Sequence, residues 1–284
     1  MNRVLVTGAA GLIGRAVLAA LRTEGIEATA LVLDDPGDLA AAAVVVGSAA
    51  DPAAVRTALA GCDGVIHLAA IPVPHGGTPL QVFGGNVSAT FTVLDEAGRA
   101  GIGHAVIASS YSATGLPFAR EVRHPAYLPI DLDVPPLVED CYGLSKQVDE
   151  LTAAMAQRAY GISVTALRLP FVGGFGDRLP GHAANVERDN SIGARDMWSY
   201  LESRDAARAA LLGLGVDGLH TVYVAAPRTL SPFPTEALLD RYHPHVERRR
   251  PLPGRTVAID LEPARRLLGF EAHHELDIIE RPLP

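Results

Sequence analysis

The stretch VLVTGAAGLIG, residues 4–14, determines the fold that this sequence predicts. Its first residues are typical of a buried strand, and residues 15–22 continue it as an amphipathic helix. Gly8 permits a tight turn out of the strand, Gly11 lets the backbone approach a pyrophosphate, and Gly14 lets the helix pack closely on the sheet. An ordinary loop rich in glycine and alanine is the alternative interpretation of these residues.

The start of this helix also predicts a ligand. Its first amides have no partner within the helix, and the helix dipole favours negative charge beside them. A diphosphate therefore fits this turn, and a dinucleotide is the ligand that a strand, a glycine turn and a helix predict together. The expected contacts are Gly8, Ala10, Gly11, Leu12, Ile13 and Gly14.

The composition excludes several classes of protein. A chain of 284 residues, 48% of them hydrophobic, can bury a substantial core in one large domain or two unequal lobes. The net charge of -8 argues against a general nucleic-acid surface. Cys62 and Cys141 lack paired spacing and the histidines are scattered, so we expect neither a disulfide nor a metal site. No signal peptide precedes residue 4 and no apolar run reaches about 18 residues, so we expect a cytoplasmic protein without a membrane or nucleic-acid partner.

Short apolar segments alternate with helical segments through the first half of the chain. This rhythm predicts an α/β fold of the Rossmann type, a doubly wound parallel sheet with helices on both faces. Asp51 is the expected N-cap of the second helix. The expected strands after the first are residues 28–33, 44–46, 65–70 and 105–108, and the expected helices are 52–60 and 86–99.

Polar residues stand where the predicted strands end. Asp34 follows the second strand, where an acidic side chain can accept hydrogen bonds from an adenosine ribose and favour NAD over NADP. A solvated turn is equally consistent with this aspartate. Ser109 and Ser110 end the fifth strand, at the edge where open α/β sheets bind ligands. His67, inside the fourth strand, fits a packed residue better than a catalyst.

Tyr142 and Lys146 form a second group of candidate residues. They are four residues apart in a helical run, so both side chains can touch one ligand. The ammonium favours the tyrosine anion, which lets Tyr142 exchange a proton with a substrate oxygen near neutral pH. The hydroxyl of Ser110 can hold the same oxygen. A surface pair is the alternative for these two residues alone, but the glycine turn and the serines make the combination specific.

These motifs resemble those of the extended short-chain dehydrogenase/reductases, in particular the NAD-dependent epimerase/dehydratase family. The resemblance implies that Tyr142 is the acid/base, that Lys146 binds the nicotinamide ribose and that Ser110 orients the substrate oxygen. It implies hydride transfer between the nicotinamide and the carbon bearing that oxygen. The motifs that carry it are Thr7 to Gly14, His67-Leu68-Ala69-Ala70, Asn86 heading its helix, Ser109-Ser110 with Gly115, Tyr142 to Lys146, and Arg168-Leu169-Pro170. The further cofactor contacts expected are Asp34, Ser48, Ala49, Leu68, Ala69, Ala70, Asn86, Leu169 and Pro170.

The sequence departs from the family pattern at three places. The usual aspartate at the end of the second strand is replaced by Val32, so Asp34, slightly later, favours NAD but leaves NADP open. The usual Gly-Asp near the third strand is Gly47-Ser48, so a hydroxyl replaces a carboxylate that faces adenine. Phe171 stands where several sugar-nucleotide epimerases carry an asparagine that contacts the substrate, which argues against a nucleotide sugar.

The second half of the chain predicts a small substrate-binding lobe. We expect loops over the cofactor at 180–190, because no periodicity is visible there. The basic run at 248–250 can meet a substrate anion, or it is a solvated charge run. Trp198 can line the pocket or pack in a core. The expected substrate contacts are Ser110, Tyr111, Tyr142, Phe171, Arg195 and Trp198. The expected boundaries are 1–170 with 203–226 for the nucleotide-binding domain, and 171–202 with 227–284 for the small lobe.

These features predict an NAD(P)-dependent oxidoreductase that acts at a secondary alcohol or ketone of a small, sugar-like substrate. The compact length also resembles the uronate dehydrogenases of the same branch. A nucleotide-sugar 4-epimerase, which is an isomerase, or a natural-product ketoreductase is the alternative enzyme. A regulator that binds dinucleotide without turnover is a third interpretation, against which the intact Ser110, Tyr142 and Lys146 argue. The resemblance implies a homodimer formed by helices at 86–99 and 142–157.

Overall fold

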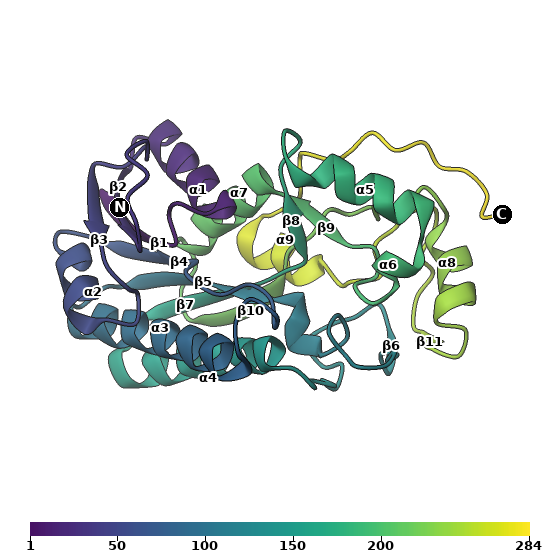
Figure 1. The fold of residues 1–284 in the computed structure, drawn as a ribbon, viewed down its shortest axis with the longest axis horizontal. Helices are drawn as coiled ribbons and strands as arrows, with labels where there is room; N and C mark the ends of the chain where they lie inside the picture. The colour runs from purple at the N-terminus through teal and green to yellow at the C-terminus, as the bar shows by residue number, and fades with distance from the viewer.

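A seven-stranded parallel sheet forms the centre of the computed structural model, which describes residues 1–284. The strands lie in the order β10-β7-β5-β4-β1-β2-β3 (Figure 1). All pairs are parallel, so the carboxyl ends of the strands meet at one edge. The predicted doubly wound α/β fold is confirmed. The strands are β1 (Arg3–Thr7), β2 (Glu27–Val32), β3 (Ala43–Val46), β4 (Gly64–His67), β5 (His104–Ser110), β7 (Ser163–Leu169) and β10 (Leu219–Tyr223).

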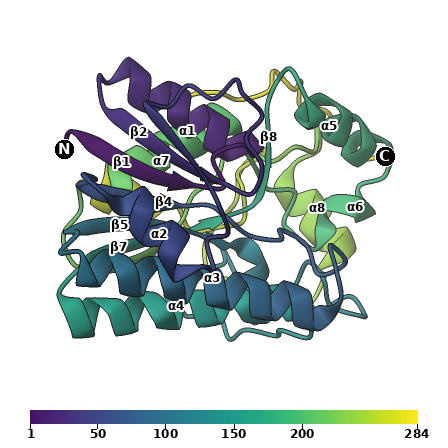
Figure 2. The ribbon, with the colours of Figure 1, turned by 60° about the vertical axis from the view of Figure 1, so that its left-hand side comes forward.

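Helices cover both faces of the sheet, as Figures 1 and 2 show from two directions. α1 (Leu12–Thr23) packs against α7 (Ser203–Gly213) on one face, and α9 (Glu262–Leu268) contacts α7. The other face carries α2 (Pro52–Leu59), α3 (Pro79–Arg99) and α4 (Cys141–Tyr160). The side chain of Asp51 caps α2 as predicted, accepting a hydrogen bond from the amide of Ala53.

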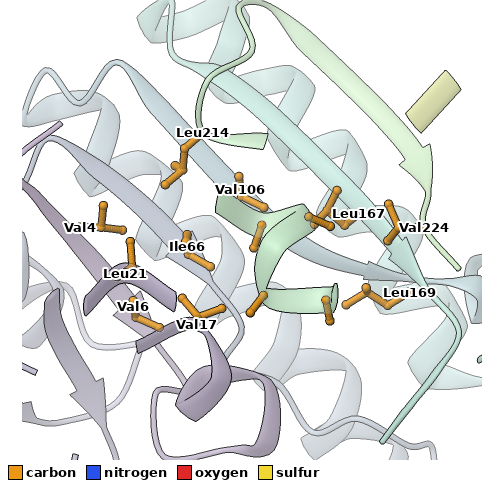
Figure 3. Close-up of a cluster of buried hydrophobic side chains, with 14 of the residues drawn as sticks. Val4, Val6, Val17, Leu21, Ile66, Val106, Leu167, Leu169, Leu214 and Val224 are labelled. Atoms are coloured by element: carbon orange, nitrogen blue, oxygen red, sulfur yellow. The ribbon is translucent and has the colours of Figure 1, made fainter. Parts of the chain in front are cut away.

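Alternate side chains of β1 enter different cores. Val4 and Val6 join Val17 and Leu21 of α1 in the core between the sheet and α1 (Figure 3). Leu5 belongs to the opposite core, beneath α2, α3 and α4. Burying a side chain of this size contributes about 1.5–3 kcal/mol. The strand is therefore apolar on both faces, as parallel strands covered on both sides are.

A smaller lobe with its own core lies beyond the sheet (Figure 1). Trp198, Tyr200 and Leu238 are buried there, together with Tyr127 and Leu128 from the segment that the sequence assigns to the nucleotide-binding domain. Strand β6 pairs with β11, and β8 pairs with β9, both in parallel. The elements are η1 (Tyr111–Thr114), β6 (Tyr127–Leu128), β8 (Phe171–Gly173), α5 (Arg178–Arg188), α6 (Ser191–Ala194), β9 (Tyr200–Glu202), α8 (Thr235–Tyr242) and β11 (Glu247–Arg248).

Helix α3 begins two turns earlier than predicted. It starts at Pro79, so Asn86 lies inside the helix rather than at its head. Thr78 is the N-cap and forms a capping box with Gln81, in which each residue's side chain bonds the other's backbone. Proline at the first helical position loses no hydrogen bond, because that amide has no partner in any helix. The prediction of a helix start at Asn86 was therefore wrong.

Two further elements differ from the prediction. Residues 180–190 form most of α5 rather than a loop. Pro180 stands in the first helical turn, where its missing amide hydrogen breaks no helical bond. Strand β4 ends at His67, and the apolar residues after it border a cavity instead of extending the strand.

The basic run at 248–250 forms ion pairs on the surface. Arg248 pairs with Glu236 and Asp240, each at 2.7 Å, and Arg250 pairs with Asp260 at 3.1 Å. Arg248 and Arg250 therefore have carboxylate partners within the chain, which agrees with a solvated charge run. None of the helices is both long enough and apolar enough to span a membrane.

Candidate active site

One cavity of about 1050 Å³ lies at the carboxyl ends of the strands and brings together almost all the predicted site residues. Every expected cofactor contact lines it, and so does every expected substrate contact except Trp198. The lining residues that were predicted are Gly8, Ala10, Gly11, Leu12, Ile13, Gly14, Asp34, Ser48, Ala49, Leu68, Ala69, Ala70, Asn86, Ser110, Tyr111, Tyr142, Lys146, Leu169, Pro170, Phe171 and Arg195.

The glycine turn leaves no room for side chains. Gly8 has a φ of +65°, and a Cβ there would lie 2.8 Å from the amide nitrogen of Ala69. A Cβ on Gly14 would lie 2.3 Å from the carbonyl oxygen of Gly8. Neither position therefore has room for a Cβ, and the turn at Gly8 and the start of α1 at Gly14 pack directly on neighbouring backbone.

The first turn of α1 offers backbone amides to the cavity. Gly11 is its N-cap and supplies no side-chain hydrogen bond. Leu12 and Ile13, the first helical residues, line the cavity. Their amides lack intrahelical acceptors, so an anion is the partner that the helix end favours. This set of donors fits the diphosphate of a dinucleotide.

His67 supports the glycine turn through its hydrogen bond with Thr7. The amides of Leu68 and Ala69 both donate to Thr7 Oγ1 at 3.2 Å, which leaves the Thr7 hydroxyl hydrogen for His67 Nδ1 at 2.7 Å. The other ring nitrogen, Nε2, lies 3.2 Å from Thr90 Oγ1. Burial, with the charge of Lys146 as the second cause, lowers the pKa of His67 to about 3. The ring is therefore neutral, packed and fully hydrogen-bonded, as expected.

Asn86 supports the cavity wall. Its Oδ1 accepts from the amide of Ile71 at 2.8 Å, and its Nδ2 donates to the carbonyl oxygen of Ile71 and to Ser145 Oγ, each at 3.1 Å. The side chain thus ties α3 to the loop after β4 and to α4. These bonds use both the oxygen and the nitrogen of the side-chain amide, and Asn86 also lines the cavity.

Helix α4 positions Tyr142 and Lys146. Asp140 caps the helix, its Oδ1 accepting from the amides of Tyr142 at 2.9 Å and Gly143 at 2.8 Å. Lys146 Nζ donates to the carbonyl oxygen of Ala108 at 2.9 Å and to Asp149 Oδ2 at 3.1 Å. An ammonium has three hydrogens, so one is left for a ligand.

Asp149 keeps the ammonium of Lys146 charged in a buried place. Both side chains are almost fully buried. Burial by itself lowers the pKa of Lys146, but the carboxylate of Asp149, with Tyr142 adding to the effect, raises it above its ordinary value. The charge therefore stands beside Tyr142, whose ring centroid is 5.8 Å from Lys146 Nζ. Asp149 could not be identified from the sequence, because a lysine and an aspartate three residues apart are common on helices.

Ser110 ends β5 and caps the short helix η1. Its Oγ accepts from the amide of Ser112 at 3.0 Å, so its own hydrogen is free for a ligand oxygen. The neighbouring Ser109 donates to Glu150 Oε1 at 2.6 Å, and Glu150 also binds Arg168 through two hydrogen bonds at 2.8 Å. This half-buried pair of Glu150 and Arg168 ties α4 to β5 and β7 behind the candidate catalytic residues.

The smaller lobe closes the other side of the cavity. Phe171 stacks on His182 with ring centroids 4.0 Å apart, and Arg195 donates to the carbonyl oxygen of Ala119 at 2.6 Å. Trp198 does not line the cavity: it is 1% exposed in the core of the lobe and donates from Nε1 to the carbonyl oxygen of Asn190 at 2.7 Å. The prediction of Trp198 as a substrate contact is therefore corrected. Lining residues that the sequence analysis did not identify include Phe118, Arg178, Ile192 and Asp196.

Comparison with known sequences agrees with this geometry. The sequence model of the NAD dependent epimerase/dehydratase family matches residues 4–212. The chain is 32% identical over 173 residues to uronate dehydrogenase of Pseudomonas putida, which covers 59% of this chain and 60% of that protein. It is also 32% identical over 176 residues to UDP-glucose 4-epimerase of Azospirillum brasilense, with 58% and 48% covered. The matched region thus spans at most three fifths of the length of these curated relatives.

Comparison with solved structures extends the likeness to the whole fold. A short-chain dehydrogenase/reductase superfamily protein from Agrobacterium tumefaciens, solved with bound NAD, is 25% identical with a TM-score of 0.72. The superposition covers 97% of this chain and 94% of that chain. NAD is the cofactor of the matching family, which agrees with the glycine turn and the free amides of α1. The chain belongs to the NAD dependent epimerase/dehydratase family.

Proposed function

We propose that this protein is an NAD-dependent dehydrogenase that oxidises an alcohol carbon of a small, sugar-like substrate. The observation that carries the proposal is that Ser110, Tyr142 and Lys146 line the same cavity as the glycine turn. A bound dinucleotide and a substrate hydroxyl can therefore share one cavity. The similarity to uronate dehydrogenase supports the dehydrogenase assignment.

The chain's own residues supply the proton chemistry. Tyr142 Oη takes the proton of the substrate hydroxyl, and Ser110 Oγ donates a hydrogen bond to the same oxygen. The charged ammonium of Lys146 stabilises the tyrosine anion and offers its remaining hydrogen to the nicotinamide ribose. When bound, NAD accepts the hydride that leaves the carbon bearing this oxygen. Reduction is the reverse, with Tyr142 returning the proton.

NAD is the preferred cofactor in this proposal. Asp34 lines the cavity where β2 ends, beside the expected place of the adenosine ribose. The basic residues that line the cavity, Lys146, Arg178 and Arg195, come from α4 and the smaller lobe. Arg15, at the start of α1, is paired with Asp38 at 2.8 Å. A 2′-phosphate of NADP would thus lie beside the carboxylate of Asp34, with no unpaired arginine from α1 to bind it.

A 4-epimerase is the second candidate. The similarity to UDP-glucose 4-epimerase favours it. An epimerase would oxidise and reduce one bound substrate and leave the cofactor unchanged overall, so Tyr142 would take and return the proton within one cycle. Retention of tightly bound NAD through purification would favour this candidate over the dehydrogenase.

A homodimer through α3 and α4 completes the proposal. These two helices pack side by side on the outer face of the sheet (Figure 2). They expose large apolar side chains there, among them Leu80 at 79% and Leu151 at 68% exposure. A second copy would bury these side chains in a four-helix arrangement. Sedimentation velocity is the test, and a monomer at micromolar concentration would contradict the dimer.

Replacing Tyr142 by phenylalanine tests the acid/base assignment. The change removes one hydroxyl, so we expect NADH formation from an accepted sugar to fall by about a hundredfold or more while NAD still binds. Tyr160→Phe is the matched control, because Tyr160 lies at the far end of the same helix and bonds Asp95 instead of lining the cavity. Wild-type rates in the Tyr142 variant would contradict the assignment.

A further inference from the structure

Phe118 packs against the ring of Tyr142, the candidate acid/base. The two ring centroids are 6.1 Å apart and the ring planes meet at 80°, which is a T-shaped contact. Phe118 is half-buried, and both side chains line the cavity. His75, from the loop after β4, makes a second T-shaped contact with Phe118, with centroids 6.4 Å apart. The Phe118 ring thus forms cavity wall beside the hydroxyl that the substrate oxygen is expected to meet.

The loop that carries Phe118 is anchored on both sides of this residue. Gly115, before it, has a φ of +81°, and a Cβ there would lie 2.2 Å from the carbonyl carbon of Leu137. Directly after it, the carbonyl oxygen of Ala119 accepts a hydrogen bond from Arg195 of the smaller lobe at 2.6 Å. Contacts within the chain therefore place Phe118 without a ligand, and a wall placed in advance discriminates among ligands by their shape.

The other aromatic rings that line the cavity have different surroundings. Phe171 stacks on His182 with centroids 4.0 Å apart, and the guanidinium carbon of Arg178 lies 4.9 Å from the centroid of the same ring. Tyr111 is only 2% exposed. Tyr142 is the residue proposed for proton transfer. Phe118 is therefore the lining aromatic residue that is left to contact the substrate through its ring.

We propose that Phe118 is a specificity-determining residue, against which the apolar face of the sugar ring packs while the reacting hydroxyl meets Tyr142. The inference rests on the proposed function, because it concerns the substrate side of the same cavity. A sugar ring is most apolar where neighbouring C–H bonds point to one face. In D-galactose the hydrogens on C3, C4 and C5 share a face, whereas in D-glucose the hydrogen on C4 points to the opposite face. An aromatic wall therefore favours the galacto configuration.

Steady-state oxidation with saturating NAD tests this contact. The probes are two pairs of sugars that differ only at C4, D-galactose with D-glucose and D-galacturonate with D-glucuronate. We expect the wild type to have the higher kcat/KM for the galacto member of the pair that it oxidises. Phe118→Ala should raise KM for that sugar about tenfold, bring the galacto-to-gluco ratio to about one, and leave KM for NAD and the pH dependence of kcat unchanged. Phe118→Tyr, which keeps the ring, should retain the wild-type ratio.

Phe175→Ala is the matched control, because Phe175 is 39% exposed, contacts Arg204 and does not line the cavity. We expect wild-type kinetics from this variant. Thermal melting of each variant with NADH checks that the fold and the cofactor site are intact. A wild-type preference for the gluco member, or a Phe118→Ala variant whose KM or galacto-to-gluco ratio stays within twofold of the wild type, would overturn the proposal. A fall in kcat with a shifted pH dependence and unchanged KM would overturn it too, because Phe118 would then act only by packing on Tyr142.

Calorimetric titration of the same four sugars into the NADH complex separates the two proposals. If no sugar is oxidised but the galacto member of a pair binds more tightly, and Phe118→Ala weakens that binding about tenfold, the contact stands and the dehydrogenase assignment fails. Oxidation of a sugar whose binding does not change in Phe118→Ala keeps the dehydrogenase assignment and overturns the contact. Absence of both binding and oxidation for all four sugars would overturn the contact as well.

Discussion

At the residue scale, the glycine turn requires that position 14 carry no Cβ. A Cβ there would lie 2.3 Å from the oxygen of Gly8 and 2.7 Å from the Cα of Ala9. Both neighbours are backbone, so no rotation of a side chain can relieve the clash. We expect Gly14→Val to raise the Kd for NAD by about tenfold or more, measured by calorimetry.

Gly181→Ala is the matched control for this substitution. Gly181 lies in α5, and an added Cβ there meets nothing within 4 Å. We expect its Kd for NAD to equal that of the wild type. Unchanged affinity in the Gly14 variant would contradict the role assigned to the turn.

His67 makes the stability of the protein depend on pH. Its pKa is about 3 in the folded chain against an ordinary value of 6.5. As the pH falls from 6.5 toward 3, the unfolded chain binds a proton that the folded chain does not, and the free energy of unfolding falls. We expect His67→Gln to lose less stability between about pH 7 and pH 5 than the wild type does, measured by urea denaturation.

The exposed His245 provides the control for this measurement. His245→Gln should follow the wild-type dependence on pH, because the side chain of His245 is exposed and its replacement removes no buried group. Parallel pH dependence in the wild type and in His67→Gln would contradict the buried, neutral state assigned to His67.

At the scale of the element, the N-terminus of α4 links stability to the candidate chemistry. Asp140 Oδ1 accepts from two amides in the first turn, one of which belongs to Tyr142. We expect Asp140→Ala to lower the free energy of unfolding by about 1 kcal/mol. It should also lower kcat/KM, because the cap fixes the backbone that carries Tyr142.

Asp51→Ala separates these two effects, since Asp51 caps α2 in the same way and does not line the cavity. Urea denaturation should give a similar loss of stability in both variants. Turnover should fall only in the Asp140 variant. Equal turnover in the two would show that the cap of α4 has no part in positioning Tyr142.

The sequence predicted helices and strands correctly where local signals, such as caps and apolar runs, agree with the tertiary contacts. The N-cap at Asp51 and the strand β5 ending in Ser110 follow from local signals. For α3, the capping box at Thr78 and Gln81 was present in the sequence, but the prolines and glycines at 72–79 favoured a loop. For α5, the lack of periodicity at 180–190 favoured a loop, and Pro180 is harmless in a first helical turn. Packing against the rest of the lobe decides such segments.

At the scale of the molecule, the proposed dimer depends on the outer face of α3 and α4. Leu151 is 68% exposed in the single chain and lies on α4 away from the cavity. We expect Leu151→Glu to convert a dimer to a monomer, because a buried, unpaired charge costs several kcal/mol. Sedimentation velocity measures the change.

Ala19→Glu, at an exposed position of α1 on the opposite face of the sheet, serves as the control for added negative charge. We expect this variant to keep the wild-type sedimentation coefficient. A dimer that persists in Leu151→Glu would place the interface elsewhere on the molecule.

The alternation of strands and helices predicted β1 to β5, because it reflects burial on both faces, but it did not predict β7. Twenty-one of the 40 residues that line the cavity were predicted, since parallel strands bring their carboxyl ends to one edge. The core of the smaller lobe could not be predicted, because it joins distant segments such as Tyr127 and Trp198 without periodicity. For the same reason Asp149 and Asp196 have no local signal: their environment exists only after folding.

The most direct test of the account is whether NADH accumulates when the purified protein turns over a sugar with excess NAD. The account predicts NADH in amounts far above the enzyme concentration and equal to the sugar oxidised, with loss of both in Tyr142→Phe. Conversion of a sugar to its epimer without NADH accumulation, or absence of any conversion across neutral sugars and uronates, would contradict it.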